Sequence, residues 1–136
     1  MKMRLILVLL ALASSISSAQ WTELGTANRK NTTYFVDLTT KQQAPDGKAT
    51  IAYLFDLHKA GECGSPARPY QSATGDHQFD CKAKLYRVLS CTRYSDHMAT
   101  GEVVSVESDF EGWSQIPPRS KVAHMYKVAC SSGSAF

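Results

Sequence analysis

Alternating hydrophobic and polar residues along most of the chain predict β-strands. The clearest segment is 49–57, where one face carries only hydrophobic side chains: Ala49, Ile51, Tyr53, Phe55 and Leu57. This alternation with period two is typical of a strand that has one buried face. Shorter strand candidates follow the same criteria at 21–24, 32–38, 101–106 and 113–116. Residues 79–94 contain no Gly, Pro or Asn, and this composition predicts one long strand.

The remaining segments predict turns, one long loop and a single helix. Pro45-Asp46-Gly47 is a turn signal, and the small and turn-forming residues of 61–76 predict a long surface loop. After Pro117-Pro118 the hydrophobic period becomes helical, with Ser120 as the expected N-cap. Strands followed by one terminal helix predict an α+β fold, an antiparallel β-sheet with a C-terminal helix packed on it. The apolar stripe of that helix consists of Val122, Met125, Tyr126, Ala129 and Cys130.

The first residues have the features of a secretory signal peptide. Lys2 and Arg4 precede a short apolar run, and small residues end at Ala19. We therefore expect a signal peptide at 1–19 and a single domain at 20–136. The product would be exported to the periplasm, or secreted or placed at the cell surface. We expect no lipid anchor, because no cysteine lies near the predicted cleavage site.

Charge argues against nucleic acid as the partner. Without Lys2 and Arg4, the total of Lys and Arg falls from 15 to 13, against 12 Asp and Glu. A protein that neutralises phosphates would need a stronger basic excess. No segment after the signal peptide is apolar enough for a membrane span, so neither nucleic acid nor a membrane span is expected.

The four cysteines of the exported part, Cys63, Cys81, Cys91 and Cys130, predict disulfides. A continuous strand over 79–94 would hold Cys81 and Cys91 about 33 Å apart, far beyond the disulfide Cα limit of about 7 Å. Two pairings then remain open. Cys63 pairs with Cys91 and Cys81 with Cys130, or Cys63 pairs with Cys81 and Cys91 with Cys130.

Candidate chemistry is sparse. The four histidines show no metal-ligand spacing, and no nucleophile stands in a recognisable motif, so we expect no metal, no cofactor and no enzymatic activity. A basic cluster lies within 79–94 and is a candidate binding surface for an acidic partner. On a continuous strand it would place Lys82 and Lys84 on one face and Arg87 and Arg93 on the other.

The order of several short motifs resembles the surface-adhesin protein E family. They include Phe79-Asp80-Cys81-Lys82, the run from Met98 to Val104, and Ile116-Pro117-Pro118-Arg119-Ser120 before the closing Lys127-Val128-Ala129-Cys130. The resemblance extends from about Trp21 to Cys130. It implies an antiparallel sheet tied to a C-terminal helix by a Cys81–Cys130 disulfide, and leaves Cys63 and Cys91 to pair with each other.

The same resemblance implies a function. Members of the family are known as bacterial surface proteins that bind host matrix and serum proteins such as laminin and vitronectin, and haem binding has also been described. We therefore expect a non-enzymatic adhesin that acts by protein–protein contact through a sheet edge or the basic cluster. The alternative is a soluble periplasmic module that binds a small ligand or inhibits another exported protein. An apolar pocket beneath the helix would favour that alternative.

Overall fold

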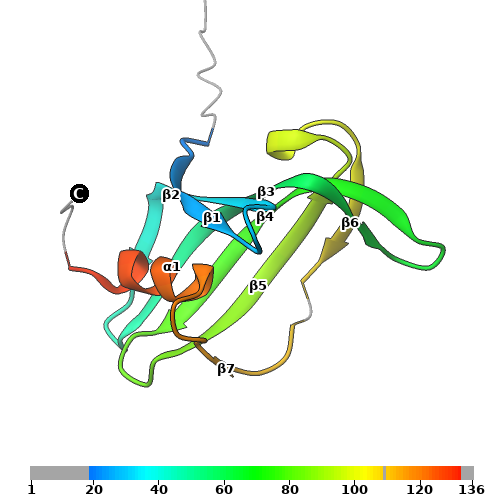
Figure 1. Cartoon of the computed structure of the whole chain (residues 1–136). Helices are drawn as coiled ribbons and strands as arrows, with labels where there is room; N and C mark the ends of the chain where they lie inside the picture. The colour runs from blue at the N-terminus through cyan, green and yellow to red at the C-terminus, as the bar shows by residue number, and fades with distance from the viewer. Residues whose placement is uncertain (1–18, 109, 133–136) are drawn as a thin grey trace, which may run out of the picture.

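The structure is a computed structural model that describes residues 19–108 and 110–132. One antiparallel sheet dominates it, and strands that are consecutive in the chain are neighbours from β1 to β6 (Figure 1). A short strand, β7, pairs with β5 outside that order. Apart from Ala19, the predicted signal peptide lies outside the described residues. The strands are β1 Thr22–Ala27, β2 Thr32–Gln43, β3 Lys48–Cys63, β4 Arg68–Asp80, β5 Leu85–Tyr94, β6 Val103–Glu107 and β7 Ser114–Gln115.

The α-helix α1 Lys121–Cys130 lies across one face of this sheet, which we call the inner face (Figure 1). Ser120 is its N-cap, as predicted, and the Ser120 hydroxyl accepts a hydrogen bond from the Ala123 N–H at 3.0 Å. The predicted α+β fold is therefore confirmed. Among the described residues, no helix has both the length and the apolar character needed to cross a membrane.

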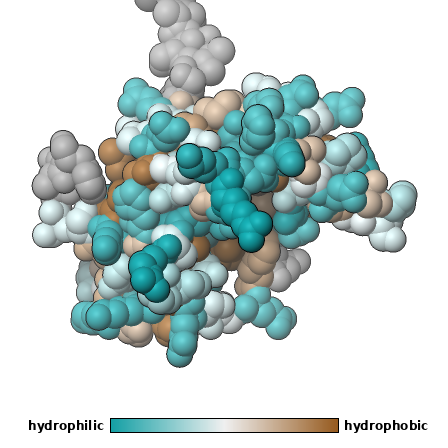
Figure 2. Space-filling view, viewed as in Figure 1, coloured by the Kyte–Doolittle hydropathy of each residue, from teal (hydrophilic) through white to brown (hydrophobic). Residues whose placement is uncertain are grey.

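The hydrophobic core fills the space between α1 and the inner face. Met125 of the helix and Ile51 and Phe79 of the sheet are completely buried. Burying a side chain of this size contributes about 1.5–3 kcal/mol relative to leaving it exposed. On the outside, hydrophilic side chains cover most of the face seen in Figure 2, and hydrophobic surface shows in patches between them. The other buried core residues are Tyr34, Val36, Ala49, Tyr53, Val122, Val128 and Ala129.

The prediction of a long surface loop at 61–76 is wrong. β3 continues to Cys63 and β4 begins at Arg68, so most of that segment is paired sheet. Its small residues have a packing role: a Cβ added at Gly61 would come within 2.8 Å of the Tyr70 ring, and one at Gly75 would overlap the Ser90 carbonyl oxygen. Gly in a strand often marks such a close approach rather than a loop.

The prediction of a single strand at 79–94 is also wrong, because the chain reverses direction between β4 and β5. The Asp80 carboxylate accepts hydrogen bonds from the backbone N–H groups of Lys82 at 3.1 Å and Ala83 at 2.9 Å. Lys84 completes the turn with a φ of 57°, in the left-handed region. An Asp side chain can thus form a turn without Gly or Pro.

Candidate functional sites

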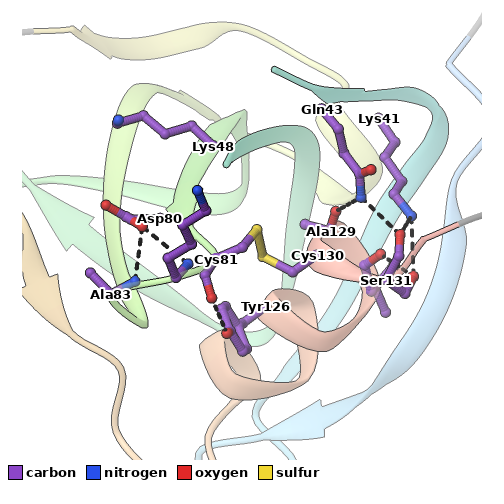
Figure 3. The surroundings of a disulfide bond; sticks show 12 residues. Lys41, Gln43, Lys48, Asp80, Cys81, Ala83, Tyr126, Ala129, Cys130 and Ser131 are labelled. Carbon is purple, nitrogen blue, oxygen red and sulfur yellow. Dashed lines mark hydrogen bonds between the residues drawn. A yellow bond between two sulfur atoms is a disulfide. The ribbon is translucent and has the colours of Figure 1, made fainter. Parts of the chain in front are cut away.

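A disulfide joins the end of α1 to the turn between β4 and β5. Cys81 and Cys130 are bonded with a Cα–Cα distance of 5.7 Å, which confirms the pairing that the family resemblance implied. Around it, the Tyr126 hydroxyl donates to the Cys81 carbonyl at 2.9 Å (Figure 3). Cys81 lies in the turn after β4 and Cys91 on β5, so the separation of about 33 Å expected along one continuous strand does not apply.

Two side chains of β2 bind the carbonyl groups at the C-terminal end of α1. Lys41 Nζ donates to the Ser131 carbonyl at 2.6 Å, and Gln43 Nε2 donates to the Ala129 carbonyl at 3.1 Å (Figure 3). The last carbonyl groups of a helix have no partners within the helix, so these bonds stabilise its end. The end of α1 is therefore held both covalently and by hydrogen bonds.

The expected Cys63–Cys91 disulfide is not formed; both residues are free thiols. Cys91 is buried in the middle of β5, opposite Glu107 of β6. The Sγ of Cys63, at the far end of β3, lies 3.8 Å from the Ser105 hydroxyl. Ser105, which the Cys63 sulfur contacts, is paired with Arg93 and not with Cys91. The two sulfur atoms therefore lie beside different residue pairs of the sheet.

The basic cluster predicted from the sequence is not one surface. Lys82 and Lys84 are exposed in the turn between β4 and β5, whereas Arg87 and Arg93 lie on β5 itself. The pairing of β5 with β4 is irregular near Leu89. A bulge of one residue reverses the alternation beyond it, so Arg87 and Arg93 point to opposite faces, not to the same face as expected.

The two arginines already have partners within the protein. The Arg87 Nε donates to the Gln78 Oε1 at 2.7 Å, and its guanidinium lies 4.6 Å from the centre of the Trp113 ring. Arg93 forms an ion pair with Glu107 at 3.0 Å. By contrast, Lys82 and Lys84 form no ion pair among the described residues. Of these four cations, Lys82 and Lys84 are the two that are exposed.

Among the described residues, the histidines belong to no cluster of metal-ligating side chains. His97 binds the Asp56 carboxylate at 3.1 Å rather than its neighbour Asp96, and both groups face the surface. His124 Nδ1 lies 2.8 Å from the Tyr34 hydroxyl. In residues 19–108 and 110–132, no group of three or more His, Cys, Asp or Glu side chains has metal-binding geometry.

A cleft on the inner face, beside the first turn of α1, was not located from the sequence. Its volume is about 260 Å³, and Tyr53, Phe55, Tyr86 and Val88 form its apolar walls; we call it the inner-face cleft. His77 also lines it and is only 2% exposed. The alternation of β4 could have indicated this position, because His77 shares a face with the buried Phe79.

Comparison with known sequences decides the family. The sequence model described as surface-adhesin protein E matches residues 21–131. The chain belongs to the surface-adhesin protein E family. Membership of a family of surface adhesins agrees with the export that the sequence predicts. A search of curated proteins gives no match.

Solved structures of protein E from Haemophilus influenzae share the fold of this family member. A selenomethionine form has a TM-score of 0.60 at 9% identity, covering 85% of this chain and 90% of that one. A second crystal form has a TM-score of 0.61 at 11% identity, with 83% and 90% covered. The protein from a non-typeable strain has a TM-score of 0.55 at 13% identity, with 83% and 85% covered. At such low identity, the likeness concerns the fold.

Proposed function

We propose that this protein is a non-enzymatic, exported adhesin that binds host matrix or serum proteins, such as laminin and vitronectin, by direct contact. The observation that carries the proposal is the family match over residues 21–131. The stapled sheet supports it, because a rigid surface loses little conformational entropy when it binds another protein.

The binding surface that we propose is a basic tip made of Lys48, Lys82 and Lys84. It combines two neighbouring turns, since the Cys81 N–H donates to the Gly47 carbonyl at 3.0 Å. The stem of Lys82 crosses Gly47, where an added Cβ would come within 3.1 Å of the Lys82 Cε. Lys48 is partly offset by Asp46 at 3.3 Å, which leaves Lys82 and Lys84 as the main cations of the tip.

Exposed charges of this kind have a modest and salt-dependent effect. Each exposed ion pair contributes about 0.2–1 kcal/mol, so reversing two lysines should weaken binding by roughly 2- to 30-fold. Screening shortens the range of such interactions from about 30 Å at 0.01 M salt to about 8 Å at 0.15 M. The effect of the reversal should therefore shrink as salt is added.

The test is binding of the oxidised mature protein to immobilised laminin and vitronectin across a salt series. We expect saturable binding that Lys82→Glu/Lys84→Glu weakens at low salt. The matched control is Lys30→Glu/Lys59→Glu, which makes the same change in charge at the other end of β2 and β3. Equal affinity of wild type and the tip variant at low salt would exclude the basic tip. Absence of binding by folded wild-type protein would exclude these two partners.

A further inference from the structure

The inner-face cleft has the composition of a small-molecule site. Its walls are aromatic and aliphatic side chains of β3 and β5, and Val122 of α1 closes one side. Ligand sites are typically apolar concavities with a few polar groups that set orientation. The volume of about 260 Å³ lies just below the range of about 300–1,000 Å³ that is typical for larger ligands. It therefore suits a single ring with a short side chain.

The charge inside the cleft is positive. Lys121, the first residue of α1, places its ammonium 5.2 Å from the centre of the Phe55 ring. Within residues 19–108 and 110–132, no carboxylate forms an ion pair with Lys121 and no Asp or Glu lines the cleft. Arg93, at the other end, is already paired with Glu107. One cation is thus left without a counter-charge beside apolar walls, which favours an anionic ligand.

His77 adds an unpaired polar group to the lining. The centre of its ring lies 4.3 Å from the centre of the Tyr53 ring, and its fully buried Nδ1 has no hydrogen-bond partner among the described residues. Burial, with a further contribution from the Lys121 charge, lowers the pKa of His77 to about 3. The imidazole is therefore neutral at pH 7 and can form a hydrogen bond without adding charge. Buried polar groups in folded proteins normally have partners, so the unpaired Nδ1 is an unmet hydrogen-bonding capacity in the lining of the cleft.

From these observations we propose that the inner-face cleft binds a small aromatic carboxylate, with its ring between Tyr53, Phe55 and Tyr86 and its carboxylate at Lys121. The ring would stack among the aromatic walls in the offset or edge-on geometry that such side chains prefer. The carboxylate would supply the missing counter-charge to Lys121 in a partly dehydrated setting, where a charge-assisted hydrogen bond is strong. This site is separate from the basic tip and does not depend on the adhesin proposal.

The experiment uses the mature oxidised protein, with 3-phenylpropanoate as probe and 3-phenylpropanamide as its neutral counterpart. Binding is followed by NMR chemical-shift changes during titration at pH 7. We expect saturable binding of the acid, with the largest shifts at Val88, Val122 and the aromatic walls, and at least fivefold weaker binding of the amide. No saturation by the acid up to millimolar concentration, or equal affinities for acid and amide, would overturn the proposal.

Variants separate the two parts of the site. Lys121→Gln keeps most of the side-chain stem but removes the charge, and should weaken binding of the acid roughly tenfold while leaving the amide unchanged. Lys127→Gln, on an exposed position of the same helix, is the matched control and should bind like wild type. Val88→Phe, which fills the cleft, should abolish binding of both probes. If Val88→Phe still binds them with wild-type affinity, the ligand lies elsewhere and the proposed site is wrong.

Discussion

Removing the Cys81–Cys130 disulfide should cost a large part of the stability of the fold. The bond closes a loop with a sequence separation of 49 residues. In the chain-entropy treatment, a loop of this length stabilises the folded state by about 4 kcal/mol at 25 °C, because it restricts the unfolded chain. Domains of this size are stable by about 5–15 kcal/mol. The Cys81→Ala/Cys130→Ala variant should therefore remain folded at 25 °C, with about 1–11 kcal/mol of stability left.

Urea unfolding measures this loss directly. With a slope of about 2 kcal/mol/M, a loss of about 4 kcal/mol moves the midpoint down by about 2 M. The variant should keep a native circular dichroism spectrum in water, because Lys41 and Gln43 still bind the end of α1. Cys63→Ser, which removes a free thiol, is the control and should shift the midpoint far less. A loss below about 1 kcal/mol would refute the argument from loop length.

Three further predictions concern single positions. Because the pKa of His77 falls from 6.5 to about 3 on folding, only the unfolded chain takes up a proton between these values. The unfolding free energy of wild type should therefore fall as the pH is lowered, by up to about 1.4 kcal/mol per pH unit more than that of His77→Phe. Parallel pH profiles of the unfolding free energy in the two proteins would contradict this. Gly75→Ala should destabilise by about 3 kcal/mol, the upper end of the usual cost of overpacking, because its Cβ would overlap the Ser90 carbonyl. A thermal midpoint like that of wild type would be the opposing result. After denaturation, a thiol reagent should find two thiols in the oxidised protein. Cys63 should react in the native state, and Cys91, which is 8% exposed, only on unfolding. Finding no thiol would show a second disulfide.

Local patterns predicted the parts of the fold that depend on local chemistry. The helix was predicted from its helical hydrophobic period and from the N-cap residue Ser120, and both are local features of the chain. The strand at 49–57 followed from alternation, because Ala49, Ile51 and Tyr53 on one face of β3 are buried, while most side chains on the opposite face, Leu54 excepted, are partly exposed. The predictions failed where the type of a residue is set by its packing against a neighbouring strand and not by the local conformation of its own segment. Gly61 and Gly75 signalled a loop, but their missing side chains make room for Tyr70 and Ser90.

The candidate sites could be predicted only in part, for the same reason. The turn after Asp80 depends on side-chain hydrogen bonds that a search for Gly and Pro overlooks. The bulge near Leu89 leaves no mark in the sequence, and it decides which way Arg93 points. The partner of Lys121 at the inner-face cleft is a ring on β3, Phe55, far away in the sequence. Such contacts follow from the tertiary arrangement and not from local composition.

The order of the strands has a consequence for how the protein matures. Because neighbours in the sheet are neighbours in the chain, each hairpin can form as soon as its second strand emerges, and contacts of this kind close quickly. The helix that covers Ile51 and Phe79 is the last element described in the chain, so this apolar face stays exposed to water until residues 121–130 are available to pack on it. During that interval the partly formed sheet is open to aggregation. Formation of the Cys81–Cys130 disulfide then fixes the helix covalently on the sheet and keeps the apolar face covered.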